Sequence, residues 1–337
     1  MTPEDELLFG VEEEFFLFQT SSQVPSHENI NRLLEMLVVS GCKPIGQSAF
    51  NSPVAVVMHQ GNHSVTIKND HSTHILELAF SPLYSLADFR LLWDTAFKML
   101  EPIFISLGLK IVSGAVLPTI PEFLTRSNET DPDGKRFGKL LNRSPTGRPL
   151  FEKKMVSCIC STQVSLGIEW NQIRPHLENL YAYEFLFPLY FSNANRFLDH
   201  HAHAIRPLII QDNFGPEFGT VGFPVKADDF TTTGGEFSRS YSYITDRGNR
   251  IEFRSADCQG NCERILQIVE LRKAILHTAM NTVSKIPLQT SRSRFYQVCR
   301  GLFTPSEAIE FLSDCNTSTQ LSDLIQKIKC EWDGSTY

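Results

Sequence analysis

The stretch FGVEEEFFLF, residues 9–18, has the composition of a strand and carries three adjacent carboxylates. Aromatic and β-branched residues favour a pleated, half-buried surface. Because strand side chains alternate between two faces, Glu12 and Glu14 share one face while Glu13 lies on the other. Like charges buried together need hydrogen bonds or cations to compensate them. The stretch therefore predicts either glutamates at a solvent-exposed strand end or a positively charged group among them.

Composition and charge exclude several classes of protein. The chain has 337 residues, of which 42% are hydrophobic and 20% charged, as is typical of a globular protein. Its net charge of −7 argues against a nucleic-acid-binding surface and a polybasic membrane-binding face. The acidic start MTPEDELLFG lacks the apolar core of a signal peptide, and no apolar run reaches the roughly 20 residues of a membrane-spanning helix. We expect a cytoplasmic protein that binds neither nucleic acid nor membranes.

Alternating and amphipathic stretches indicate the fold class. Strands are predicted at residues 9–18, 63–70, 74–80, 155–168 and 250–257, and helices at residues 26–41, 85–107, 177–187 and 263–283. In the strand at 155–168, Ser161, Gln163 and Ser165 share a polar face, which is typical of an antiparallel sheet with one open side. Strands and long helices in irregular order predict an α+β fold, in which helices back one face of an antiparallel sheet.

Two further predicted strands carry a carboxylate where an apolar face is expected. Glu77 lies within HILELAF, seven residues after Asp70. Glu252 and Arg254 share one face of RIEFRSAD. A single glutamate of this kind is more often a satisfied core or edge residue, but several together need a cation. Oxygen ligands without a set of cysteines and histidines favour Mg²⁺ or Mn²⁺ over zinc.

The cysteines and the glycine motifs bear on the cofactor. The eight cysteines show neither a secreted disulfide spacing nor the CxxC pairs of a structural zinc site, so we expect free thiols. Carboxylates that hold Mg²⁺ beside an arginine suit phosphoryl transfer from a nucleotide. No Walker A motif and no GxGxxG follows a predicted strand, so the sheet and its metal ions would hold the nucleotide.

In their order along the chain, these stretches resemble the glutamate–cysteine ligase superfamily, especially the bacterial carboxylate–amine ligases of its second class. FGVEEEF is similar to the family's G-V-E-x-E strand, DHSTHILELAFSP to its segment with Asp and Glu seven residues apart, and RIEFRSAD to its E-[LVF]-R-x-x-D strand. The resemblance covers residues 9–283 and implies an antiparallel sheet curved into a funnel with helices outside. We place a single catalytic domain at residues 1–300 and a C-terminal helical extension at residues 301–337.

The resemblance also implies a reaction and roles for matching residues. ATP would phosphorylate a carboxylate, usually the γ-carboxyl of glutamate, and an amine would attack the acyl phosphate to form an amide. The cofactors would be ATP and Mg²⁺ or Mn²⁺, the partners would be small-molecule amino-acid substrates, and a homodimer is left open. The implied metal ligands are Glu12, Glu14, Glu77 and Glu252. The implied catalytic residues are Arg254, on the phosphate side, with Glu252 and Asp70. The predicted cofactor-binding residues are Ser165, Gln163, Arg206 and Lys68.

One position departs from the family pattern. The family's strand typically reads Q-V-H-[VY]-[GN], whereas this chain reads QVSLG, with Ser165 in place of the histidine. A hydroxyl is a weak ligand and cannot donate as an imidazole does. His200, His201 and His203 could reach the site from elsewhere, although a solvated turn or helix start explains them more simply.

Alternatives to a ligase follow from this departure. A relative with other Mg-nucleotide chemistry, a kinase or a phosphohydrolase, is favoured by Ser165, and product analysis separates it from an amide-forming enzyme. A non-catalytic binding protein has no reason to keep five costly polar groups: Glu12, Glu14, Glu77, Glu252 and Arg254. The basic segment at residues 127–149 is either a solvated loop or a lid over an anionic ligand, and substrate specificity would lie in such loops.

Overall fold

The computed structural model describes residues 7–47, 52–70, 73–117, 155, 158–193, 204–214, 244–283 and 286–334. In these ranges the strands are β1 (Phe9–Gln19), β2 (Lys43–Ile45), β3 (Ala55–Gln60), β4 (His63–Asn69), β5 (Ile75–Leu83), β6 (Leu109–Val112), β7 (Ser161–Leu166), β8 (Ile244–Asp246) and β9 (Ile251–Asp257). They form one sheet in the order β2-β3-β4-β5-β1-β7-β9-β8, and β6 pairs with the end of β1. All of these strand pairs are antiparallel.

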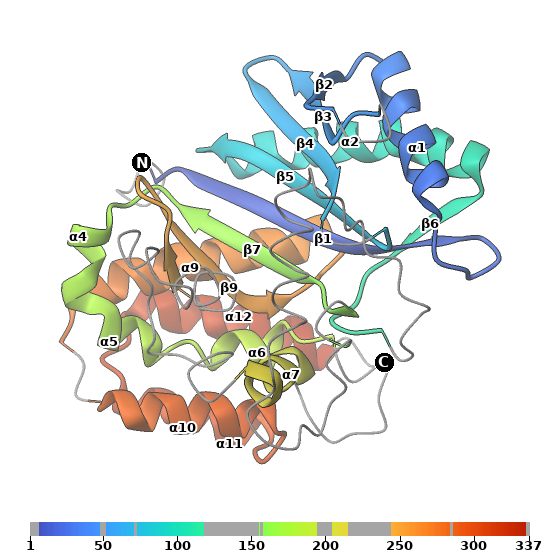
Figure 1. Cartoon of the computed structure of the whole chain (residues 1–337). Coiled ribbons are helices and arrows are strands. Elements are labelled where there is room, and N and C mark those ends of the chain that lie inside the picture. The colour runs from blue at the N-terminus through green and yellow to red at the C-terminus, as the bar shows by residue number, and fades with distance from the viewer. Residues whose placement is uncertain are drawn as a thin grey trace.

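Helices in the described ranges back one face of this sheet. They are α1 (His27–Val39), α2 (Leu86–Leu107), α4 (Trp170–Ile173), α5 (Leu177–Tyr181), α6 (Leu186–Tyr190), α7 (Ile205–Phe214), α9 (Cys262–Asn281), α10 (Leu288–Cys299), α11 (Pro305–Ile309) and α12 (Thr319–Gly334). Figure 1 shows α2 behind β4 and β5, and α9 behind β7 and β9. The predicted α+β fold, an antiparallel sheet backed by helices, is confirmed.

Apolar side chains at alternate positions of β1 determine which face is covered. The rings of Phe9 and Phe89 lie 6.2 Å apart, and Phe89 belongs to α2. One helical turn further on, the ring of Trp93 lies 6.2 Å from that of Phe15. Because strand side chains alternate, the two glutamates that share a face of β1 project from the side opposite α2. The helix-covered face is therefore apolar and the other face carries the acids.

The strand predicted at residues 155–168 is shorter than the alternation suggested. β7 begins only at Ser161. Before it, Ile159 forms an isolated bridge with Val116, and the N–H of Cys160 donates to the carbonyl of Ala115 at 3.0 Å. These residues therefore pair with the segment after β6 instead of with β1. The alternation of polar and apolar residues indicates extended chain, which the structure shows. It does not indicate where along the chain the pairing partner changes from the segment after β6 to β1.

The helix predicted at residues 177–187 is interrupted. The N–H of Glu184 donates to the carbonyl of Tyr181, three residues earlier, at 3.3 Å. Such bonds tighten the chain into a turn between α5 and α6. The turn places the buried Glu184 against Arg272 of α9. A buried ion pair thus lies where the sequence predicted one unbroken helix.

The C-terminal helices share the core of the molecule. α12 packs on α9, and its residues Leu321, Ile325 and Ile328 are buried in the same apolar cluster as the strands. The division at residue 300 stays a prediction. Among the residues described, no helix combines the length and the apolar character needed to cross a membrane. All eight cysteines are free thiols, as expected.

Glu13, on the covered face, ties β1 to the turn between β9 and α9. Its Oε1 accepts hydrogen bonds from the backbone N–H groups of Gln259 and Gly260, both at 2.8 Å. Gly260 has a φ of 61°, which glycine adopts without steric cost. Thr162 Oγ1 lies 2.5 Å from Glu13 Oε2 and 3.0 Å from the carbonyl oxygen of Asp257. Thr162 has one hydroxyl proton, which it donates to the carbonyl of Asp257. A protonated Glu13 then donates its own proton to Thr162 Oγ1.

Glu13→Gln is expected to flatten the pH dependence of stability. Burial raises the pKa of Glu13 from 4.5 to about 7, so the folded state holds the proton more tightly than the unfolded state does. As pH rises from 4.5 through 7, the parent should lose up to about 3 kcal/mol of its free energy of unfolding relative to the variant. Glutamine can still accept from the turn and donate to Thr162. Urea unfolding of both proteins from pH 4.5 to 8 measures the difference, and parallel profiles would contradict it.

Candidate active site

Strand pairing brings predicted acids together on the open face of the sheet. Glu14 of β1 lies directly opposite Glu77 of β5, which in turn lies opposite Lys68 of β4. Residues opposite each other in antiparallel strands project to the same side. The Lys68 Nζ lies 3.2 Å from Glu77 Oε2. Asp70 directly follows β4, and its N–H donates to the carbonyl of Ile75 where the chain enters β5.

Three of these carboxylates form a candidate metal site. Glu14, Asp70 and Glu77 each offer an oxygen atom, and these atoms lie within 4.8 Å of one another. Burial raises the pKa of Glu77 well above its ordinary value, and Lys68 acts in the opposite direction. A divalent cation would favour the charged carboxylates and offset their burial. The donor set consists of oxygen alone, which fits Mg²⁺ or Mn²⁺.

Glu12 lies between these acids and a group of arginines. In the strand register it is opposite Gln163 of β7. Burial and the charge of Glu252 raise the pKa of Glu12 above its ordinary value. The positive charges of Arg254 and Lys68 lower it. The pKa of Glu12 is therefore influenced by charges on both sides of it. One side is the acidic end of the site, at β4 and β5, and the other is the basic end, at β9.

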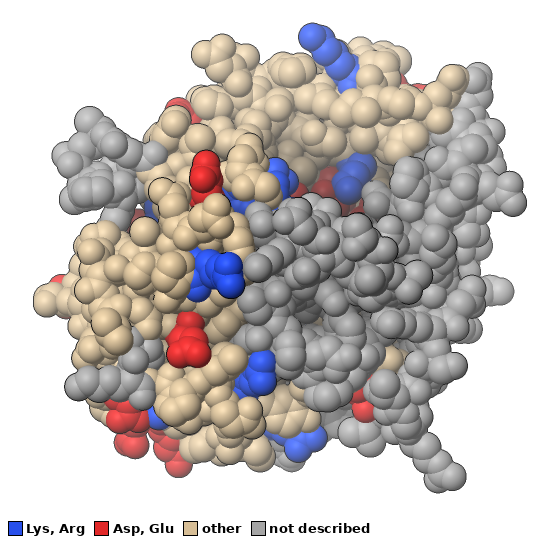
Figure 2. All heavy atoms as spheres, turned by 60° about the vertical axis from the view of Figure 1, so that its left-hand side comes forward, with Lys and Arg blue, Asp and Glu red and all other residues tan. Residues whose placement is uncertain are grey.

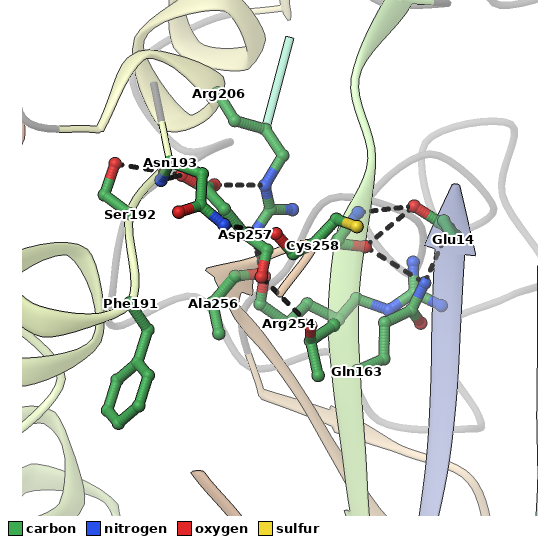
Figure 3. A network of polar contacts seen from close by, with 12 residues as sticks. Glu14, Gln163, Phe191, Ser192, Asn193, Arg206, Arg254, Ala256, Asp257 and Cys258 are labelled. Atoms are coloured by element: carbon green, nitrogen blue, oxygen red, sulfur yellow. Dashed lines mark hydrogen bonds and ion pairs between the residues drawn. The ribbon is translucent and has the colours of Figure 1, made fainter. Parts of the chain in front are cut away.

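Glu14 is held in place by β7. Its Oε2 accepts hydrogen bonds from the backbone N–H of Ser161 at 2.8 Å and from the Ser161 hydroxyl at 2.9 Å. Its Oε1 accepts from the Gln163 side-chain amide at 2.9 Å (Figure 3). Gln163, which we predicted to bind the cofactor, is here a hydrogen-bond partner of a candidate metal ligand. Its direct contact with a nucleotide stays a prediction.

Two arginines enclose Glu252. Arg247 makes a two-pronged contact, with Nε 3.0 Å from Glu252 Oε2 and Nη2 2.7 Å from Oε1. Arg254 Nε lies 2.5 Å from the same Oε1. Burial alone would raise the pKa of Glu252, but Arg254 and Arg247 outweigh it and lower the pKa to about 2. The carboxylate is thus ionised and paired, and its role as a metal ligand stays a prediction.

Sequence reasoning missed Arg247. It follows β8 in the turn DRGNR, where its N–H donates to the carbonyl of Arg250 at 2.9 Å. The turn joins β8 and β9 into a hairpin. In the sequence, a glycine flanked by polar residues just before the strand with Glu252 indicates such a turn. The pairing of β8 and β9 then carries Arg247 to Glu252.

Arg206 is buried on α7 and contacts β9. Its Nε lies 3.3 Å from Asp257 Oδ1, and its Nη2 donates to the carbonyl of Ala256 at 3.0 Å and to that of Arg254. Figure 3 shows this group on one side of β9, while Arg254 reaches towards Glu14. These contacts make Arg206 a support for the strand that carries Arg254. Its predicted contact with the nucleotide stays a prediction.

A pocket with a volume of about 280 Å³ adjoins the acids. Glu12 and Ser165 line it together with the hydroxyl-bearing Ser64 and Thr66 and with Arg250. Ser165 lines this pocket and is opposite Glu252 in the register of β7 and β9. Figure 2 shows a hollow in one face of the molecule, with acidic and basic side chains at its bottom.

Other residues singled out from the sequence cannot be placed. His200, His201 and His203 and the basic segment at residues 127–149 lie outside the described residues.

The fold and site define an α+β protein whose open antiparallel sheet carries clustered carboxylates beside arginines. No protein-family model matches the chain, and no curated protein matches it. Solved structures do match. A glutamate–cysteine ligase from Francisella tularensis, solved in complex with AMP, has a TM-score of 0.58 and 12% identity, over 97% of this chain and 82% of that chain.

A second solved structure is a bifunctional glutathione synthetase from Pasteurella multocida. It has a TM-score of 0.56 and 11% identity, over 98% of this chain and 48% of that chain. The chain thus spans about half the length of the Pasteurella enzyme. These likenesses show that the chain has the fold of the glutamate–cysteine ligases, which confirms, for the fold, the resemblance inferred from the sequence.

Proposed function

We propose that the protein is an ATP-dependent carboxylate–amine ligase that forms an amide through an acyl phosphate. The acid substrate would be glutamate or a glutamate-like molecule, and the protein would act in the cytoplasm on small amino-acid substrates. The observation that carries the proposal is the convergence of Glu14, Asp70 and Glu77 on the open face of a sheet with this fold. Glu252 and Arg254 lie on β9, two strands away from β1 in the same sheet, and Arg247 follows β8, the next strand.

Each part of the site has a role in this proposal. Glu14, Asp70 and Glu77 would hold Mg²⁺, and Glu12 would complete the acidic end. Bound Mg²⁺ supplies positive charge to the phosphates of ATP. The guanidinium of Arg254 donates hydrogen bonds to the phosphoryl group while it is transferred.

The chemistry requires two group transfers. A carboxylate oxygen of the substrate attacks the γ-phosphorus and ADP leaves. The amine then attacks the acyl carbon, phosphate leaves, and the amine nitrogen loses a proton. Incubation with ATP, Mg²⁺ and amino-acid pools, followed by mass spectrometry, should give ADP, phosphate and one new amide in equal amounts. Phosphate without an amide would indicate a phosphohydrolase, and a phosphorylated product would indicate a kinase.

Arg254→Lys is expected to lower turnover by roughly ten- to a hundredfold, because lysine keeps the charge but loses the planar fork. Nucleotide affinity should change much less, since Arg254 acts mainly on the phosphoryl group in transfer. Steady-state turnover together with equilibrium titration of ATP separates the two effects. An equally steep fall in affinity would make Arg254 a ground-state binding residue.

A further inference from the structure

We propose that Glu252 anchors a pair of guanidinium groups instead of a metal ion, and that Arg247 is a second binding residue for the nucleotide's phosphates. This inference rests on the proposed function. It gives a phosphate-binding role to a residue outside all the sequence motifs and a positioning role to Glu252.

The contacts of Glu252 carry the first step. Arg247 occupies one position on each carboxylate oxygen, and Arg254 occupies a second position on Oε1. An ionised carboxylate has about four acceptor positions, of which three are taken here. A divalent cation bound at the remaining position would lie beside two positively charged guanidinium groups. Their repulsion would weaken the binding of that cation. Arginine therefore compensates Glu252 where a metal ion would otherwise be needed.

The separation of charges across the sheet carries the second step. The three carboxylates whose oxygens converge come from β1, β5 and the residue after β4, and Glu252 is not among them. β9 is separated from β1 by β7. Glu12, between the two groups, is influenced by the charges of Lys68 and Glu77 on one side and Arg247 and Glu252 on the other. One end of the site suits a cation and the other suits an anion, as a metal-bound polyphosphate requires.

The free donor of Arg247 carries the third step. Its Nε and Nη2 hold Glu252, whereas Nη1 makes no hydrogen bond to any of the residues that the structure describes. The Arg247 side chain is 19% exposed, so the residue is not sealed off from a ligand. Arg250, at the other end of the same turn, lines the adjoining pocket. A guanidinium that is held on one edge and free on the other is oriented for a phosphate oxygen.

The test separates metal binding from phosphate binding. Mn²⁺ affinity is measured by electron paramagnetic resonance without nucleotide, and inorganic tripolyphosphate affinity is measured by calorimetry with Mg²⁺. Glu77→Gln should weaken Mn²⁺ binding about tenfold or more, while Glu252→Gln should change it about twofold at most. Arg247→Gln should weaken tripolyphosphate binding about tenfold and leave the Mn²⁺ affinity the same or higher. Arg247→Lys, which keeps the charge, should bind tripolyphosphate more tightly than Arg247→Gln but more weakly than the parent. Arg90→Gln, which removes an exposed arginine paired with Glu263, is the matched control and should change neither affinity.

Two results would overturn the inference while leaving the ligase proposal intact. One is a loss of Mn²⁺ affinity in Glu252→Gln as large as that in Glu77→Gln. The other is unchanged tripolyphosphate affinity in a folded Arg247→Gln, with folding checked by its melting temperature. If the parent protein binds neither Mn²⁺ nor tripolyphosphate, the proposed function itself fails, and the inference fails with it.

Discussion

Glu77→Gln is expected to lower turnover by about a thousandfold or more and to abolish divalent-dependent ATP binding, because it removes a ligand from the centre of the acid group. The same change should raise stability in metal-free buffer. Burial raises the pKa of Glu77 in the folded state, so ionising it costs stability as pH increases above its unfolded value of 4.5. At pH 7 the neutral amide removes that cost and the repulsion from Glu12 and Asp70.

Melting curves with and without Mg²⁺ measure both parts of this prediction. Without metal, the variant should melt at a higher temperature than the parent, and added Mg²⁺ should stabilise only the parent. Glu101→Gln, at an exposed position on α2, is the matched control and should follow the parent in both buffers. A Glu77→Gln protein that binds Mg²⁺ and ATP as well as the parent would contradict the metal assignment.

The second large effect is on stability, at a buried ion pair beneath β9. Arg272 of α9 donates to both carboxylate oxygens of Glu184, with Nη2 3.1 Å from Oε2. The hydroxyl of Ser255 donates to the same Oε2 at 2.7 Å. The Arg272 guanidinium also lies over the rings of Phe187 and Phe253. Because Ser255 directly follows Arg254, this pair supports the strand that carries Arg254.

Glu184→Leu should lower the free energy of unfolding by about 3–5 kcal/mol, because it leaves the Arg272 charge buried without a partner. The double variant Glu184→Leu/Arg272→Met should recover most of that loss, since an apolar pair of similar volume avoids the desolvation of both charges. Glu263→Gln, which breaks an exposed pair with Arg90, should cost less than about 1 kcal/mol. Urea unfolding measures the free energy of unfolding of the three variants, and we expect the largest loss in Glu184→Leu. A double variant as unstable as Glu184→Leu would contradict the prediction.

Much of the fold and the acidic end of the site follow from alternation alone. The pattern of FGVEEEFFLF separates Glu13 from its two neighbours, and the structure places Glu13 on the helix-covered face, where it is hydrogen-bonded to Thr162, Gln259 and Gly260. Asp70 and Glu77 were found because each stands in or beside a strand that is otherwise apolar. These features are local in sequence, so a period of two is enough to detect them.

The remainder depends on contacts between distant segments. Arg247 reaches Glu252 only because a hairpin turn sets the register of β8 and β9. Glu184 meets Arg272 across 88 positions of the chain, and no local pattern marks either partner. The interruption between α5 and α6 coincides with this ion pair, since Glu184 lies in the turn that separates the two helices. Tertiary contacts therefore decide which polar groups support the site and which ones face it.

The central claim is that ATP activates a substrate carboxylate, and the fate of that carboxylate's oxygen tests it directly. Amino-acid pools labelled with ¹⁸O in their carboxylates are incubated with the protein, ATP and Mg²⁺, and the released phosphate is analysed by mass spectrometry. Attack of a carboxylate on the γ-phosphorus transfers its oxygen to the phosphoryl group, and the amine then displaces phosphate with that oxygen attached. We predict one ¹⁸O atom in each phosphate released. Consumption of ATP with release of unlabelled phosphate would contradict the claim.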